Sequence, residues 1–181
     1  YFGAATAAAK LLGLDVEGMI NAWGIAYAQA SGNLECVASG ALTKRIQAGF
    51  AARGGVLAAL MAQKGITGAR ESLEGKAGIF NVYQRGEYEP AVLTADLGRR
   101  FEVVNLSYKP YPCCRWTHSG IDAALKLRQA VSSDGLDEVE ITVSEKAWQS
   151  IGEPVEAKRR PRNIVDAQFS FPYTAATALV K

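Results

Sequence analysis

The chain has 181 residues, 49% of them hydrophobic, and a formal net charge of +2 at pH 7. This composition allows a buried core in one or two domains and gives no general attraction to an acidic partner. Positive charge gathers only in the run KRRPR at residues 158–162. That run could contact an acidic partner or nucleic acid, but a solvated loop is the simpler interpretation. Because no aromatic residues interleave with the run, we expect no nucleic-acid partner.

The three cysteines, at positions 36, 113 and 114, have neither the number nor the spacing of a disulfide framework or a zinc site. We therefore expect a cytoplasmic location and no metal. No apolar run is long enough to span a bilayer, so we expect no membrane association. The chain begins without Met, and the helical patterns at both ends are cut short, which indicates an internal piece of a longer protein.

The first hundred residues have the pattern of packed helices. Three long helices are predicted, at residues 4–12, 16–30 and 43–64. Two shorter helical pieces follow, at residues 70–74 and 77–83. Glycine inside a helix costs about 0.5–1 kcal/mol relative to alanine. Gly49, Gly54 and Gly55 therefore indicate close helix packing or, as the less simple alternative, a nearby ligand.

The remaining residues have a different pattern, which predicts an α+β unit. Residues 101–108 and 139–143 alternate in polarity and predict two strands. Between them a helix is predicted from residue 118 to about 131, ended by a break at residues 132–135, and a last helix begins near residue 174. We therefore predict the fold class α+β, with part of a helical domain at 1–100 and an α+β domain at 101–181. Whether the second domain is complete at its C-terminal end stays open.

His118 is the only histidine, and it lies where a helix is predicted to begin. Thr117 has the side chain of an N-cap, which would place His118 in the first turn. There the helix dipole favours the neutral imidazole, which can accept a proton. Lys109, Arg115 and Tyr111 lie close by in sequence. A neutral base beside fixed cations suits proton abstraction from a carboxylate substrate.

Other interpretations of this segment remain. His118 could be a hydrogen-bonded structural residue, and Pro110 and Pro112 could simply stiffen a turn. Cys113 or Cys114 could be a nucleophile, but both lie too near His118 in sequence for a known thiol-protease arrangement. Neither a glycine-rich phosphate loop nor a GxSxG nucleophile elbow occurs in the sequence.

Three separated segments together carry a family resemblance. They are TKRIQAGFAA at 43–52 with GVLAAL at 55–60 and GITG at 65–68, KPYPCC at 109–114 with His118 and IDA at 121–123, and AQFSFPY at 167–173. In this order they resemble the MmgE/PrpD family of dehydratases, decarboxylases and epimerases. Each segment alone is modest, but the ordered set spans nearly the whole chain.

The resemblance implies a large helical domain and a smaller α+β lid domain, with the active site in the cleft between them. It implies a homodimer that works without metal or organic cofactor on a small di- or tricarboxylate. The implied reactions move protons next to carboxylates and lose water, lose carbon dioxide, or invert a carbon. We therefore predict a lyase similar to 2-methylcitrate dehydratase. The alternatives are an epimerase or racemase of a dicarboxylate, and a non-catalytic carboxylate-binding or dimerisation module.

The resemblance also implies roles for individual residues. His118 would be the general base or acid, Tyr173 a second proton donor, and Lys44 and Lys109 would bind carboxylates and stabilise enolate-like charge. Each of these residues also has a structural alternative. Lys44 could cap a helix face, Lys109 could be a surface charge, and Tyr173 could be a core aromatic residue.

Two further residues, Gln47 and Arg115, are predicted to contact substrate. Gln47 stands where many family members carry a histidine, which weakens the case for 2-methylcitrate itself. The family's catalytic Asp, Thr and His of the helical domain would precede Tyr1. We therefore expect no normal activity from this chain alone.

Overall fold

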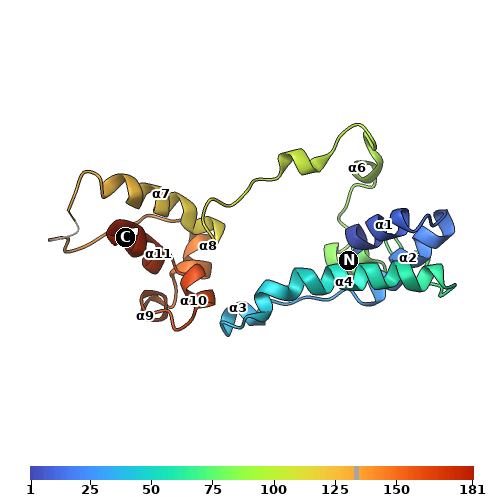
Figure 1. Cartoon of the computed structure of the whole chain (residues 1–181), viewed down its shortest axis with the longest axis horizontal. Coiled ribbons are helices and arrows are strands. Elements are labelled where there is room, and N and C mark those ends of the chain that lie inside the picture. The colour runs from blue at the N-terminus through green and yellow to red at the C-terminus, as the bar shows by residue number, and fades with distance from the viewer. Residues whose placement is uncertain (133–134) are drawn as a thin grey trace. The chain divides into compact units, whose positions relative to one another are not determined.

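The computed structural model describes residues 1–132 and 135–181, and these residues are helical or irregular, with no β-strand among them. They form two compact units, one made of residues 1–34 and 43–104 and the other of residues 35–42 and 105–181 (Figure 1). In the described part of the chain, no helix combines the length and apolar character needed to cross a membrane. The described fold is all-helical, so the predicted α+β fold class was wrong.

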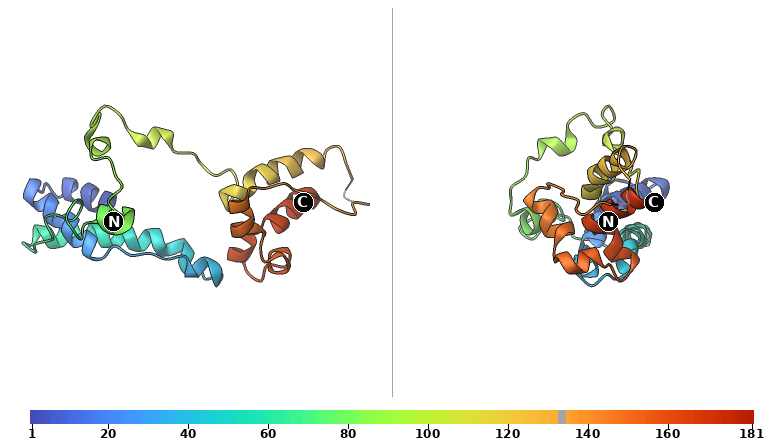
Figure 2. Two further views of the ribbon diagram at one scale, coloured as in Figure 1. Left: turned by 180° about the vertical axis from the view of Figure 1, so that it is seen from behind. Right: turned by 90° about the vertical axis from the view of Figure 1, so that its left-hand side faces the viewer.

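Three long helices form the body of the first unit (Figures 1 and 2). They are α1 (Phe2–Leu11), α2 (Val16–Ala28) and α4 (Thr43–Gln63). Shorter elements follow: α5 (Ile79–Gln84), α6 (Ala91–Thr94) and the 3-10 turn η1 (Glu102–Asn105) at the unit's edge. The long helices lie within a few residues of the predicted ranges. The predicted helical piece at 70–74 is instead a run of turns.

Local signals in the sequence explain where α1 ends. Gly13 takes a left-handed conformation with φ of 68°, which glycine adopts without strain. Its amide donates to the Lys10 carbonyl at 3.1 Å, and the Leu14 amide donates to the Ala9 carbonyl at 3.0 Å. This pair of bonds is the Schellman motif, which satisfies the last carbonyls of a helix.

Small residues let α1, α2 and α4 approach closely. Their buried core positions are mostly alanine: Ala5, Ala9, Ala22, Ala26, Ala58 and Ala59 are all fully buried. A Cβ atom at Gly55 would lie 2.5 Å from the Tyr1 carbonyl oxygen, and one at Gly54 would lie 2.7 Å from the Tyr1 ring. Close packing therefore explains these two glycines. At Gly49 nothing lies within 4 Å of the position that a Cβ atom would take, so close packing does not explain this third glycine.

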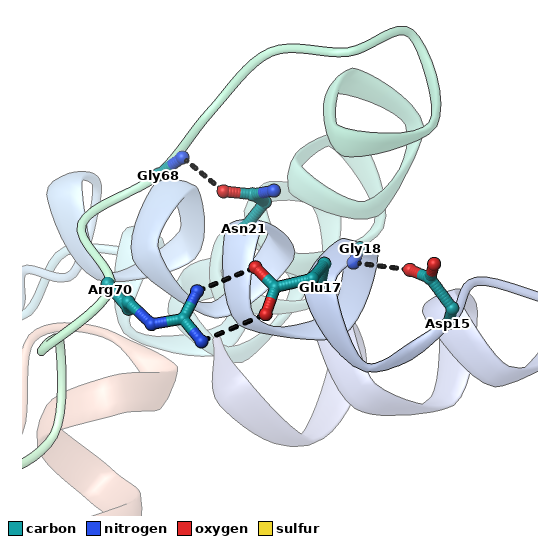
Figure 3. Close-up of polar contacts among 6 residues, drawn as sticks. All are labelled: Asp15, Glu17, Gly18, Asn21, Gly68 and Arg70. Carbon is teal, nitrogen blue, oxygen red and sulfur yellow. Dashed lines mark hydrogen bonds and ion pairs between the residues drawn. The ribbon is translucent and has the colours of Figure 1, made fainter.

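The loop after α4 is attached to α2 by polar contacts (Figure 3). The Gly68 amide donates to Asn21 Oδ1 at 3.1 Å, and Arg70 donates two hydrogen bonds to the Glu17 carboxylate. At the start of α2, Asp15 Oδ1 accepts a 2.8 Å bond from the Gly18 amide and caps the helix. The loop therefore lies along the first turns of α2.

The second unit is built from short helices around α7 (His118–Leu127) and α11 (Phe171–Val180). The other elements are α3 (Glu35–Ala38), η2 (Arg115–Thr117), α8 (Glu145–Ala147), the π-helical turn η3 (Trp148–Gly152), α9 (Val155–Arg159) and α10 (Ile164–Gln168). A Cβ atom at Gly120 would lie 2.3 Å from the Phe171 ring, so glycine lets α7 and α11 pack together. Ser170 caps α11, which starts three residues earlier than predicted.

The two predicted strands are corrected here. Residues 102–105 form the 3-10 turn η1, and residues 139–143 have no regular structure. The alternation in the second segment is real, because Ile141 and Val143 are half-buried and pack against the cluster of Ala147, Ile151 and Phe171. Side chains of α8, η3 and α11 cover Ile141 and Val143. No neighbouring strand pairs with the backbone of residues 139–143 in the described part of the chain, and a β-strand requires such a partner. The predicted break at 132–135 includes residues 133 and 134, which lie outside the described residues.

Candidate active site

One pocket of about 310 Å³ in the second unit lies between the segment before η2 and the start of α7. It is lined by Ser107, Tyr108, Lys109, Pro110, Arg115, His118 and Ser119. Three of the six predicted site residues, Lys109, Arg115 and His118, therefore meet at one pocket. They come from a short stretch of chain that folds back on itself.

His118 is the first residue of α7, as predicted, and its side chain is half-buried. Its Nε2 atom is buried and has no hydrogen-bond partner among the described residues. An unpaired buried polar group costs about 1–3 kcal/mol, so nearly all such groups in proteins are paired. An unpaired imidazole nitrogen on a residue that lines a pocket is therefore an indication of a functional site.

Thr117 does not cap α7, which corrects the predicted N-cap. Its Oγ1 donates to the Cys114 carbonyl at 2.7 Å and lies 3.0 Å from Cys113 Sγ. The turn η2 already gives residues 115–117 a helical conformation before α7 begins. The threonine hydroxyl therefore stabilises that turn, and α7 continues from it without a side-chain cap.

The cationic side chains of Lys109 and Arg115 line the same pocket. Lys109 Nζ donates to the Cys113 carbonyl at 2.9 Å, and Arg115 Nη1 donates to Ser107 Oγ at 2.6 Å. Both bonds go to neutral oxygens. Among the described residues, neither cation has a carboxylate within ion-pair distance. Their positive charge is therefore left to act on the pocket, where an anionic ligand would be stabilised.

Tyr173 lies on a different cavity of the second unit. This cavity has a volume of about 560 Å³, and its walls come mainly from α7, α10 and α11. Tyr173 is 42% exposed, and its backbone amide donates to Ser170 Oγ at 3.1 Å. The structure thus places Tyr173 apart from the pocket that holds Lys109 and His118.

Lys44 and Gln47 lie in the first unit, in the opening turns of α4. Gln47 Nε2 donates to the Asn33 carbonyl at 3.0 Å, and both side chains are half-buried. The first turn of α4 carries Lys44 and Arg45 but no acidic residue.

Sequence reasoning did not select Tyr111 as a site residue, yet the structure places it against His118. The two rings meet edge to face, with centroids 5.5 Å apart and planes at 83°. Tyr111 Oη also donates to Asp122 Oδ1 at 2.6 Å. The available signal was the spacing of His118 and Asp122, four residues apart on one predicted helix, which places them on the same face.

The three cysteines are free thiols, with Cys36 buried and Cys113 and Cys114 half-buried. The described residues contain no group of three or more His, Cys, Asp or Glu side chains that could hold a metal ion. The side chains that line the pocket include one imidazole, one ammonium and one guanidinium, together with the hydroxyl groups of serine and tyrosine residues. Such a set can hold a carboxylate and exchange a proton with it.

The described residues thus form a helical fold whose second unit has a pocket lined by an imidazole and two cations. Comparison with known families identifies the family. Residues 1–91 match the MmgE/PrpD N-terminal domain, and residues 111–181 match the MmgE/PrpD C-terminal domain. The chain belongs to the MmgE/PrpD family.

Several curated proteins are similar to this chain. A cis-aconitate decarboxylase-like protein, oryM, of Aspergillus oryzae is 32% identical over 98% of the chain and 39% of its own length. Cis-aconitate decarboxylase of Aspergillus terreus is 36% identical over 69% of the chain and 26% of its own length. The human cis-aconitate decarboxylase is 32% identical over 70% of the chain and 26% of its own length. The chain thus spans well under half the length of these relatives.

Proposed function

We propose that this chain is part of a lyase that acts on a small di- or tricarboxylate by proton transfer next to a carboxylate. The observation that carries the proposal is the pocket at the start of α7. It brings His118, with its unpaired Nε2, together with Lys109 and Arg115, which carry no carboxylate partner among the described residues.

The roles of these side chains follow from their chemistry. The imidazole of His118 accepts or delivers the proton at carbon. When a proton or a carboxyl group leaves the carbon next to a carboxylate, negative charge spreads onto the carboxylate oxygens. Lys109 and Arg115 stabilise that charge, and fixed cations are most effective where charge develops in the transition state.

Loss of carbon dioxide is the reaction we favour within this class. The similar proteins named above are cis-aconitate decarboxylases or like them, and cis-aconitate is a tricarboxylate. In such a reaction a carbon–carbon bond breaks, carbon dioxide leaves, and the electron pair left behind is captured by a proton. His118 in its protonated form would supply that proton. In a dehydration such as that of 2-methylcitrate, the same groups would act, but His118 would accept the proton from carbon instead of supplying it.

The proposal also assigns roles to Lys44, Gln47 and Tyr173. Lys44 binds a substrate carboxylate from the cationic first turn of α4, and Gln47 contacts the substrate beside it. Tyr173 serves as a second proton donor. The support for all three residues is the family membership.

Assembly and location also stay predictions. We propose a homodimer in the cytoplasm that works without metal or organic cofactor. Light scattering of the purified protein tests the dimer, and metal analysis of the active protein tests the absence of a metal requirement.

A substrate screen with product analysis tests the proposal. The full-length gene product is incubated in D₂O with cis-aconitate, 2-methylcitrate and an amino-dicarboxylate, and products are followed by NMR. Decarboxylation is expected with cis-aconitate, with carbon dioxide released and one deuterium placed on carbon. A product that has lost water instead would select dehydration.

The same screen separates the remaining alternatives. Deuterium exchange at carbon with an unchanged skeleton would select an epimerase or racemase. Saturable binding of these carboxylates without any turnover would overturn the lyase proposal and select a binding module.

A further inference from the structure

Tyr111 contacts α7 at two points one helical turn apart. Its ring packs edge to face on His118, with centroids 5.5 Å apart, and its hydroxyl donates a 2.6 Å bond to Asp122 Oδ1. Residues four apart on a helix lie on the same face, so one tyrosine side chain spans the distance between them. The bond to Asp122 therefore restrains the ring at its contact with His118.

The hydroxyl end of this contact persists at neutral pH. Its hydrogen bond to Asp122 raises the pKa of Tyr111 above the ordinary value of 10.0, and partial burial and the carboxylate charge act in the same direction. The phenol thus stays protonated and keeps donating throughout the physiological range.

The backbone on either side of Tyr111 is also restrained. Pro110 and Pro112 fix their own φ angles and bias the residues before them toward extended conformations. The Tyr111 carbonyl accepts a 2.9 Å bond from the Cys113 amide, and the Gln168 side chain donates to the Pro112 carbonyl. The tyrosine therefore contacts α7 from a restrained turn, and its ring can limit the rotation of the imidazole.

We infer that Tyr111 is a positioning residue for His118: the bond to Asp122 fixes the tyrosine ring, and the ring fixes the plane of the imidazole. This inference rests on the proposed function, in which His118 transfers the proton. Proton transfer requires the imidazole nitrogen to meet the substrate carbon in a narrow range of geometry, and a ring free to rotate loses rate.

A simple packing role is the competing explanation. Tyr111 also packs against the buried cluster of Ile121, Ala124, Ala178 and Leu179. That role needs the ring but not the hydroxyl, whereas positioning needs both. The hydroxyl and its acceptor are therefore the groups to change.

The test compares variants that remove or retain the hydrogen bond. Tyr111→Phe removes the donor and Asp122→Ala removes the acceptor, while Asp122→Asn is the matched control because its amide oxygen can still accept. Steady-state kinetics are measured on the full-length gene product. Tyr111→Phe and Asp122→Ala should each lower kcat about tenfold with KM within about twofold, because chemistry is impaired and binding is not.

The double variant sharpens the result. If both single changes act through one bond, Tyr111→Phe with Asp122→Ala should be no slower than either alone. Asp122→Asn should keep kcat within about twofold of the parent protein. An Asp122→Asn variant as slow as Asp122→Ala would assign the effect to the carboxylate charge and overturn the inference.

A spectroscopic readout separates this inference from the proposed function. His118 is the only histidine of the chain, so labelling this 181-residue chain with ¹³C,¹⁵N-histidine gives one set of imidazole signals. Tyr111→Phe and Asp122→Ala should shift and broaden these signals, and Asp122→Asn should not. Far-UV circular dichroism confirms that each variant folds.

The kinetic and the spectroscopic measurements can reject the proposed function and the positioning role separately. Absence of turnover in every protein, with His118 signals that still respond to the two variants, would reject the proposed function and retain the positioning role. Parent-like kcat and unchanged His118 signals in Tyr111→Phe would reject the positioning role and leave the proposed function standing.

Discussion

Both terminal nitrogens of the Arg70 guanidinium bind the carboxylate of Glu17, at 2.6 and 2.9 Å (Figure 3). The two residues are 53 positions apart in sequence, and the bond from the Gly68 amide to Asn21 Oδ1 attaches the same loop. Because the ion pair is solvent-exposed, its contribution to global stability is small. Its effect is local, since it fixes the loop after α4 on the first turns of α2.

This ion pair predicts a pH-dependent loop. The hydrogen bond from Arg70 lowers the pKa of Glu17 below its ordinary value of 4.5. A group whose pKa is lowered by folding stabilises the fold above its unfolded pKa, and that contribution is lost as the pH falls through the folded pKa. We therefore expect amide protection factors of residues 66–70 to stay constant above pH 4.5 and to decrease below it, as measured by hydrogen exchange with mass spectrometry.

Arg70→Ala should reproduce the low-pH behaviour at pH 7. Protection in the loop should decrease several-fold, while the thermal midpoint changes by a few degrees at most. Arg99→Ala, another exposed arginine of the same unit, is the control and should leave the loop unchanged. Equal loop protection in Arg70→Ala and the parent protein would contradict the assignment.

Two glycines of α4 should respond to alanine in opposite directions. At Gly55 a Cβ atom would lie 2.5 Å from the Tyr1 carbonyl oxygen and 2.7 Å from the Ala5 amide nitrogen, which are backbone atoms of the chain packed against it. Gly55→Ala should therefore lower the free energy of unfolding by about 1–3 kcal/mol. Gly49 has no atom within 4 Å of that position, so Gly49→Ala should raise it by about 0.5–1 kcal/mol.

Chemical denaturation of both variants measures these differences. The two sites lie on one helix, so each variant is a control for the other. A Gly49→Ala protein that is destabilised as much as Gly55→Ala would show that the open side of Gly49 is covered in solution.

The sequence predicts the long helices well because their signals are local. Gly13, Asp15 and Ser170 act at helix ends through bonds to residues three positions away. The prediction of two strands was wrong because strand formation depends on a partner strand elsewhere in the chain. The alternation at Ile141 and Val143 indicated which side chains are covered, but it could not indicate that helices cover them.

The same distinction applies to the site. Lys109, Arg115 and His118 lie within ten residues, so their meeting at one pocket could be anticipated. The spacing of His118 and Asp122 indicates one helix face, but it does not indicate that Tyr111, eleven positions before Asp122, contacts that face, because only the fold-back of the turn onto α7 brings it there. The place of Tyr173 on another cavity was equally beyond sequence reasoning.

Lys44→Ala should weaken substrate binding more than turnover. If Lys44 binds a carboxylate in the ground state and the transition state alike, its loss raises KM about tenfold or more and leaves kcat within about threefold. Lys64→Ala, just beyond the other end of α4, is the matched control because it removes the same charge at the opposite end of the helix. Unchanged KM in Lys44→Ala would assign that lysine a structural role.

His118→Ala should remove the proton-transfer group and leave the fold intact. The expected loss of turnover in the full-length gene product is about a hundredfold or more. Lys126→Ala, an exposed lysine in the last turn of α7, is the control and should keep parent-like turnover. Because the substitution empties part of a pocket of about 310 Å³, added imidazole should restore some of the lost rate in a concentration-dependent way. Near-parent turnover in His118→Ala would exclude this histidine from the mechanism. A loss without imidazole rescue, accompanied by a lowered thermal midpoint, would assign it to packing beside Tyr111.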